Sequence, residues 1–120
     1  MKRHYEVEND FFYRGQRCLV LKGDWRCGYV GIKPTHPLYG IEYNDNGPDF
    51  DQPCPEDLLR CHGGITYSGN SRLSKDDGVW WFGFDTAHSF DRLKGGRPLE
   101  YVTEEVIKLA DQLADLEVPK

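Results

Sequence analysis

The chain has 120 residues, of which 38% are hydrophobic and 13% aromatic, and its formal net charge at pH 7 is −5. This length and composition predict one compact domain with a buried core. The acidic balance makes direct binding to DNA or RNA unexpected, because proteins that follow the phosphate backbone usually carry an excess of basic residues. No stretch approaches the ~20 apolar residues of a membrane helix, and the N-terminus has no apolar signal-peptide core. We expect a cytoplasmic protein with a single domain over residues 1–120.

Four cysteines need an explanation: Cys18, Cys27, Cys54 and Cys61. Without an export signal, the reducing cytosol favours free and mostly buried thiols over disulfides. Zinc is the alternative, because Cys54, Cys61 and His62 would supply three ligands if they converged. The chain has no CxxC pair of the kind that structural zinc sites use. We therefore predict neither a structural metal nor another cofactor.

The first third of the chain predicts short strands separated by turns. Residues 1–10 are polar and charged, which is typical of a loose arm or a short edge strand. Residues 11–23 predict two strands around a turn at Gly15 and Gln16, and residues 27–32 predict a further strand.

Two pairs of side chains in this region have either a structural or a ligand-binding interpretation. Arg14 and Arg17 flank the turn, and we interpret them as solvated edge charges, with ligand contact as the alternative. His36 and Tyr39 lie in a loop that prolines exclude from the sheet, because proline has no N–H for the ladder. Such a loop suits binding, and local packing over the sheet edge is the alternative.

The central block, residues 61–91, gathers histidines, tryptophans, glycines and small hydroxyl residues, and we expect the functional site there. Gly63 and Gly64 follow His62, and the amides of adjacent glycines can cradle an anion. An isolated HGG is far from the P-loop pattern, so these glycines are candidate ligand contacts and not a diagnostic motif.

The segment WWFGFD, residues 80–85, is the best strand in the chain, because tryptophan and phenylalanine favour a pleated, half-buried surface. Alternation places its first, third and fifth residues on a core face, and Trp81, Gly83 and Asp85 on the other face. Gly83 then leaves a gap in which a flat ligand could sit between Trp81 and Asp85. A β-bulge or close strand packing would explain this glycine equally well.

A second strand of the central block is predicted at ITYS, residues 65–68. Alternation places Thr66 and Ser68 on one side, and the isoleucine and the tyrosine on the other. If this strand pairs with WWFGFD, Thr66 and Ser68 lie beside Trp81 and Asp85, with two histidines at the rim.

Those histidines are His62 and His88, and two acids accompany the second of them. Asp85, His88 and Asp91 are spaced by three residues, so they share one side of a helical or turn-like segment. A carboxylate that orients an imidazole is the arrangement of a general base or a metal ligand. Alternatively, Asp85 caps the turn after the strand and His88 hydrogen-bonds locally.

The C-terminal part predicts one amphipathic helix over residues 101–117, with Thr103 as its N-cap and an apolar stripe at helical spacing. Short strands joined by turns favour antiparallel pairing, because parallel strands need long crossovers. We therefore predict an α+β fold: a small antiparallel sheet of about four to six short strands, with this helix packed on one face.

Three blocks of the sequence, followed by the short amphipathic helix, resemble a family of small accessory proteins of bacteriophages and prophages: RCGYVGIKPTHPLYG, HGGITYS and WWFGFDTAHSFD. The resemblance extends from about Tyr13 to Leu116. It implies a setting in an infected bacterial host, and it assigns no catalytic residue. Small accessory phage proteins often counter host defence by sequestering nucleotide signals, by cleaving them, or by blocking a nuclease through direct contact.

We expect a binding protein that sequesters a small nucleotide-like ligand. The candidate ligand-binding residues are His36, Tyr39, His62, Gly63, Gly64, Thr66, Ser68, Trp81, Asp85 and His88. One alternative is a hydrolase of such a nucleotide, with His62, Asp85, His88 and Asp91 as the catalytic candidates. Another is an acidic inhibitor that binds a host nuclease or defence protein. Assembly into a homo-oligomer is left open.

Overall fold

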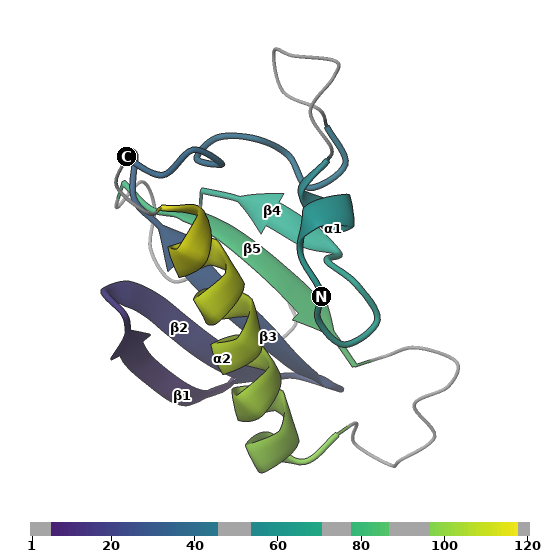
Figure 1. Ribbon diagram of the computed structural model, residues 1–120. Coiled ribbons are helices and arrows are strands. Elements are labelled where there is room, and N and C mark those ends of the chain that lie inside the picture. The colour runs from purple at the N-terminus through teal and green to yellow at the C-terminus, as the bar shows by residue number, and fades with distance from the viewer. Residues whose placement is uncertain (1–5, 46–53, 71–77, 87–96, 118–120) are drawn as a thin grey trace.

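A computed structural model describes residues 6–45, 54–70, 78–86 and 97–117 of the chain. The elements follow the order β1 (Glu6–Tyr13), β2 (Gln16–Lys22), β3 (Arg26–Ile32), α1 (Pro55–Leu58), β4 (Tyr67–Gly69), β5 (Trp80–Asp85) and α2 (Leu99–Leu116). They form a five-stranded antiparallel sheet with α2 packed on one face (Figure 1). The predicted α+β fold is therefore confirmed.

The strands lie in the order β1-β2-β3-β5-β4, so β1 and β4 are the two edges of the sheet. The β1–β2 turn consists of Arg14 and Gly15, whose φ values are 52° and 79°. A two-residue hairpin turn of this kind needs positive φ at both central positions, and Gly15 adopts it without steric cost. The predicted turn at Gly15 and Gln16 was therefore displaced by one residue. The predicted N-terminal arm contributes its residues from Glu6 onward to β1.

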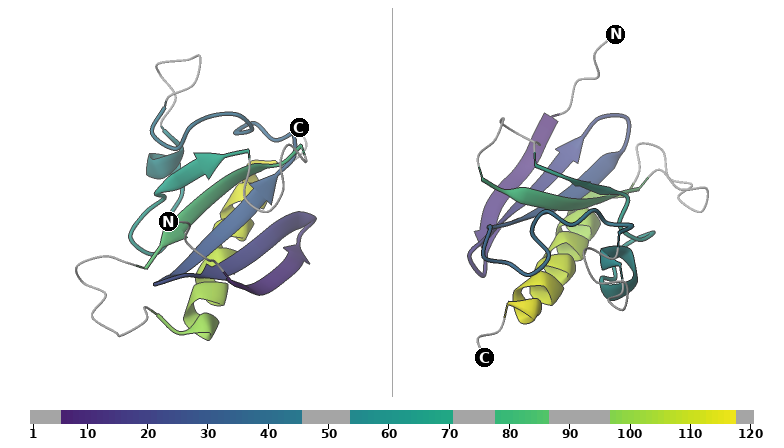
Figure 2. Two further views of the ribbon diagram at one scale, coloured as in Figure 1. Left: turned by 180° about the vertical axis from the view of Figure 1, so that it is seen from behind. Right: turned by 90° about the horizontal axis from the view of Figure 1, so that it is seen from above.

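The main core lies between the sheet and α2, and the loop after β3 and α1 cover the same face (Figures 1 and 2). The predicted core face of β5 is confirmed, because Trp80, Phe82 and Phe84 are buried in this cluster. On β3, a Cβ at Gly28 would lie 2.5 Å from a methyl group of Val106 on α2. Only glycine at this position allows the helix to approach the sheet so closely.

The helix α2 begins at Leu99, with Pro98 in the N-cap position. Thr103 lies inside the helix, so the prediction that it caps the first turn was wrong. Proline favours helix starts because its fixed φ suits the first turn and its missing N–H is not needed there. Neither of the two described helices combines the length and the apolarity required to cross a membrane.

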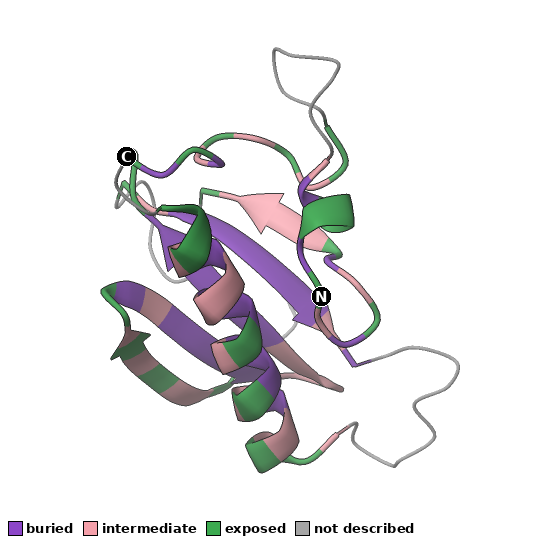
Figure 3. Cartoon of the chain, in the orientation of Figure 1, coloured by how far each residue is buried: buried purple, intermediate pink, exposed green. Residues whose placement is uncertain are grey.

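The opposite face of the sheet carries a second buried cluster. Leu19, Leu21, Tyr29 and Trp81 form it, and three partly buried residues pack against them. Figure 3 shows the consequence, because β2, β3 and β5 are buried along most of their length while the edge strands are not. The central strands are thus enclosed on both faces.

Candidate functional site

The gap predicted beside Gly83 is filled by protein. A Cβ at this position would collide with the ring of Tyr29 on the neighbouring strand β3. Trp81 has 0% of its surface exposed. Close strand packing therefore explains Gly83, and the structure has no gap at this position for a flat ligand between Trp81 and Asp85.

The pairing of β4 with β5 is confirmed, but the register differs from the predicted one. Ser68 lies opposite Phe82, and Gly69 lies opposite Trp81. Ser68 is therefore on the helix side of the sheet, where its hydroxyl donates to Glu42 Oε1 at 2.7 Å. The prediction that Ser68 lies beside Trp81 was wrong. The strand β4 begins only at Tyr67, so the alternation of ITYS does not continue along one regular strand.

Two other residues of ITYS show where the alternation ends. Ile65 is buried in the helix-side core, whereas Tyr67 packs against the second cluster, so they do not share a side. Thr66 does lie beside Asp85, as predicted: its N–H donates to the carbonyl of Gly83 at 2.9 Å, and its hydroxyl is 3.4 Å from Asp85 Oδ2.

His62 lies against the N-terminal part of α2. Its side chain is buried, its Nδ1 is 2.7 Å from the hydroxyl of Tyr101, and the two rings meet edge to face. The guanidinium of Arg97 stands 5.4 Å from the centre of the Tyr101 ring. Gly63 and Gly64 have positive φ, and the Gly64 N–H closes a turn onto the carbonyl of the preceding cysteine. That amide is thus engaged within the turn.

Two members of the predicted acid–base set, His88 and Asp91, lie outside the described residues. Within the ranges that the structure describes, His, Cys, Asp and Glu side chains form no group of three or more that could hold a metal ion. Burial raises the pKa of Cys18 and of Cys61 to about 12 in each case. Both side chains are therefore thiols at neutral pH, which disfavours them as nucleophiles or metal ligands.

His36 and Tyr39 have packing roles in the loop after β3. The Nδ1 atom of His36 accepts the N–H of Leu38 at 3.0 Å, so its Nε2 carries the proton and donates to the carbonyl of Leu113 at 2.7 Å. Tyr39 packs on Trp80, with ring centres 6.2 Å apart. Of the two interpretations left open for this loop, the contacts favour packing.

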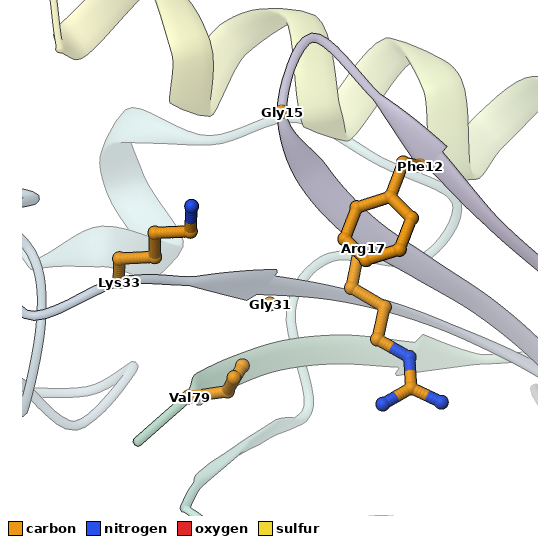
Figure 4. A pocket seen from close by; sticks show the side chains of 6 residues that line it. All are labelled: Phe12, Gly15, Arg17, Gly31, Lys33 and Val79. Carbon is orange, nitrogen blue, oxygen red and sulfur yellow. The ribbon is translucent and has the colours of Figure 1, made fainter. Parts of the chain in front are cut away.

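A hollow of about 340 Å³ lies on the face of the sheet opposite α2, near the β1–β2 turn. Its lining residues are Phe12, Gly15, Arg17, Gly31, Lys33 and Val79 (Figure 4). The strand register places Phe12, Arg17 and Gly31 side by side in one row across β1, β2 and β3. In Figure 4, Gly31 lies between Lys33 and the Phe12–Arg17 pair.

The floor of the hollow is apolar. A Cβ at Gly31 would collide with Val79 and would lie 3.1 Å from the Trp81 ring. The ring of Trp81 therefore lies beneath this part of the surface, although it is not itself exposed. The Val79 side chain and the Trp81 ring fill the space that a side chain at Gly31 would take, and Gly31 thereby lets them form the floor.

The walls of the hollow combine one exposed aromatic ring with two cations. Phe12 is 71% exposed, although phenylalanine burial would stabilise the fold by ~1.5–3 kcal/mol. Arg17 donates from Nε and Nη2 to the two carboxylate oxygens of Asp10, at 3.1 and 2.9 Å. Lys33 is exposed, and it forms no ion pair within the described part of the chain.

The sequence predicted the site elsewhere, because Phe12 has the pattern of an ordinary strand residue and Arg17 that of a solvated edge charge. The signal that was available is alternation in β1: Phe11 packs against the main core, so its neighbour Phe12 must point to the other face. Comparison with protein-family models, with curated proteins and with solved structures finds no match for this chain.

Proposed function

We propose that the protein binds a small anionic ligand with a flat ring, of the nucleotide type, in the hollow formed by Phe12, Arg17, Gly31 and Lys33. The observation that supports this most is that the exposed Phe12 ring and the exposed Lys33 both line one hollow. A base stacked on an aromatic side chain gains ~1–3 kcal/mol. A lysine ammonium attracts phosphate as a point charge.

The dimensions and chemistry of the hollow favour binding over turnover. Its volume of about 340 Å³ is at the small end of the range for ligand pockets. None of its six lining residues has a carboxylate, an imidazole, a hydroxyl or a thiol. In the phage setting that the sequence resemblance implies, retention of an unaltered nucleotide would withdraw a signal from a host defence protein.

The proposal is tested by equilibrium titration of the purified protein with adenosine and guanosine monophosphates in a calorimeter. We expect Phe12→Ala to weaken binding by about tenfold or more, because the stacking contribution of ~1–3 kcal/mol is lost. Phe12 is exposed, so the variant should unfold at the same denaturant concentration as the wild type.

The matched control is Val7→Ala, which also removes an exposed apolar side chain from β1, where Val7 is 45% exposed. Val7 lies at the other end of the strand and does not line the hollow. Its removal should leave the affinity unchanged. The proposal fails if the wild type binds neither nucleotide, or if Val7→Ala is as harmful as Phe12→Ala.

A further inference from the structure

Resting on the proposed nucleotide binding, we infer that the hollow selects ligands with a single phosphate group over those with two or three. The reason is the number of uncompensated positive charges at its walls. Lys33 has no carboxylate partner in the described ranges, whereas Arg17 is held in a two-point pair by Asp10. The hollow therefore offers one net positive charge.

One phosphate already exceeds that charge. A phosphate monoester carries about −1.5 to −2 charges at pH 7. A second or third phosphate adds negative charge for which the lining provides no further uncompensated cation. Because the volume is only about 340 Å³, a longer phosphate chain would also extend beyond the walls and into solvent.

The surroundings disfavour additional negative charge. On β1, the strand that carries Phe12, Glu8 and Asp10 are paired with Arg26 and Arg17, so their charges are compensated, whereas the whole chain has a net charge of −5. Charges interact over a Debye length of about 8 Å at physiological ionic strength, so a polyphosphate that extends away from Lys33 gains no further attraction from this net negative chain. Lys33 attracts the first phosphate, and no uncompensated cation of the lining attracts the next.

The test is a calorimetric titration with adenosine, AMP, ADP and ATP, at low and high sodium chloride concentration. We expect AMP to bind about tenfold more tightly than adenosine, and ADP and ATP to bind no more tightly than AMP. Added salt should weaken AMP binding and leave adenosine binding unchanged. Lys33→Met should reduce AMP affinity to that of adenosine, while Lys33→Arg should restore it, and Lys22→Met on the opposite face should have no effect.

Asp10→Asn gives a second readout, because it removes the carboxylate that holds Arg17 in a two-point pair. This variant should bind ADP more tightly, relative to AMP, than the wild type does. Affinity that rises stepwise from adenosine to ATP in the wild type would overturn the inference and leave nucleotide binding intact. A preference of Asp10→Asn for AMP over ADP that is stronger than in the wild type would also overturn it. If none of the four compounds binds, the proposed function itself fails.

Discussion

Glycine residues determine how closely the strands of this sheet approach their neighbours. Gly28 accommodates Val106, Gly31 accommodates Val79, and Gly83 accommodates the ring of Tyr29. None of these three positions requires positive φ, so the constraint is space and not backbone conformation. A methyl group at any of them must displace a packed side chain.

For Gly83→Ala we predict a loss of ~1–3 kcal/mol in the free energy of unfolding, which is the usual cost of overpacking a core. Urea denaturation followed by circular dichroism measures it. Gly69→Ala on the adjacent edge strand is the comparison, because the added methyl group would meet the hydroxyl end of Tyr67, a half-buried side chain of the same strand. Equal stability of Gly83→Ala and wild type would show that the Tyr29 ring moves aside easily.

Side chains from the rest of the fold hydrogen-bond to the C-terminal half of α2. Gln16 donates to the carbonyl of Ala110 at 2.8 Å, and His36 donates to that of Leu113 at 2.7 Å. The last turn of α2 has no basic residue, and the Glu117 N–H bonds to Ala114. His36 therefore satisfies a carbonyl that the helix leaves without its usual partner.

For His36→Ala we predict a loss of ~1–3 kcal/mol for each buried group left unsatisfied, the carbonyl of Leu113 and the N–H of Leu38. Thermal and urea unfolding measure this loss. Arg14→Gly is the comparison, because it removes exposed ion pairs to Asp111 and Asp115 but relieves a positive φ. We expect it to remain within about 1 kcal/mol of wild type. A larger loss for Arg14→Gly than for His36→Ala would contradict this ranking.

The sequence predicted where the strands and the helix lie better than it predicted which of their faces are buried. The segment WWFGFD is β5 as expected, because its residue types and its alternation identify a strand without tertiary information. Alternation shows that Trp81 and Trp80 point to opposite faces, but it does not show that both faces are buried. The opposite holds for Phe12. An apolar residue in a strand is usually predicted to be part of the core, but Phe12 is exposed on the edge strand β1.

The sheet is a layer with a buried cluster on each side. The helix-side cluster is the larger, and the cluster around Trp81 adds four buried residues on the other face. The proposed ligand site lies at the margin of this second cluster, since the Trp81 ring lies under Gly31. Trp81 therefore contributes to the stability of the fold and also supports the floor of the proposed ligand site, although its buried ring cannot stack on a ligand.

Substitutions of Trp81 separate its contribution to stability from its contribution to binding. Trp81→Ala should lower the free energy of unfolding by ~3–5 kcal/mol, because it removes a large buried side chain and leaves a cavity. Domains of this size are stable by only ~5–15 kcal/mol, so this loss is a large fraction of the total, and any loss of ligand binding should follow the unfolded fraction of the variant.

Trp81→Phe retains an aromatic core residue and should fold with a smaller loss of stability. At a temperature where it is folded, its nucleotide affinity should match that of the wild type, because Phe12 and Lys33 are unchanged. Denaturation curves and calorimetric titrations of the same samples give both quantities. A folded Trp81→Phe protein with affinity reduced tenfold would show that binding depends on the shape that the buried Trp81 ring gives to the floor of the hollow.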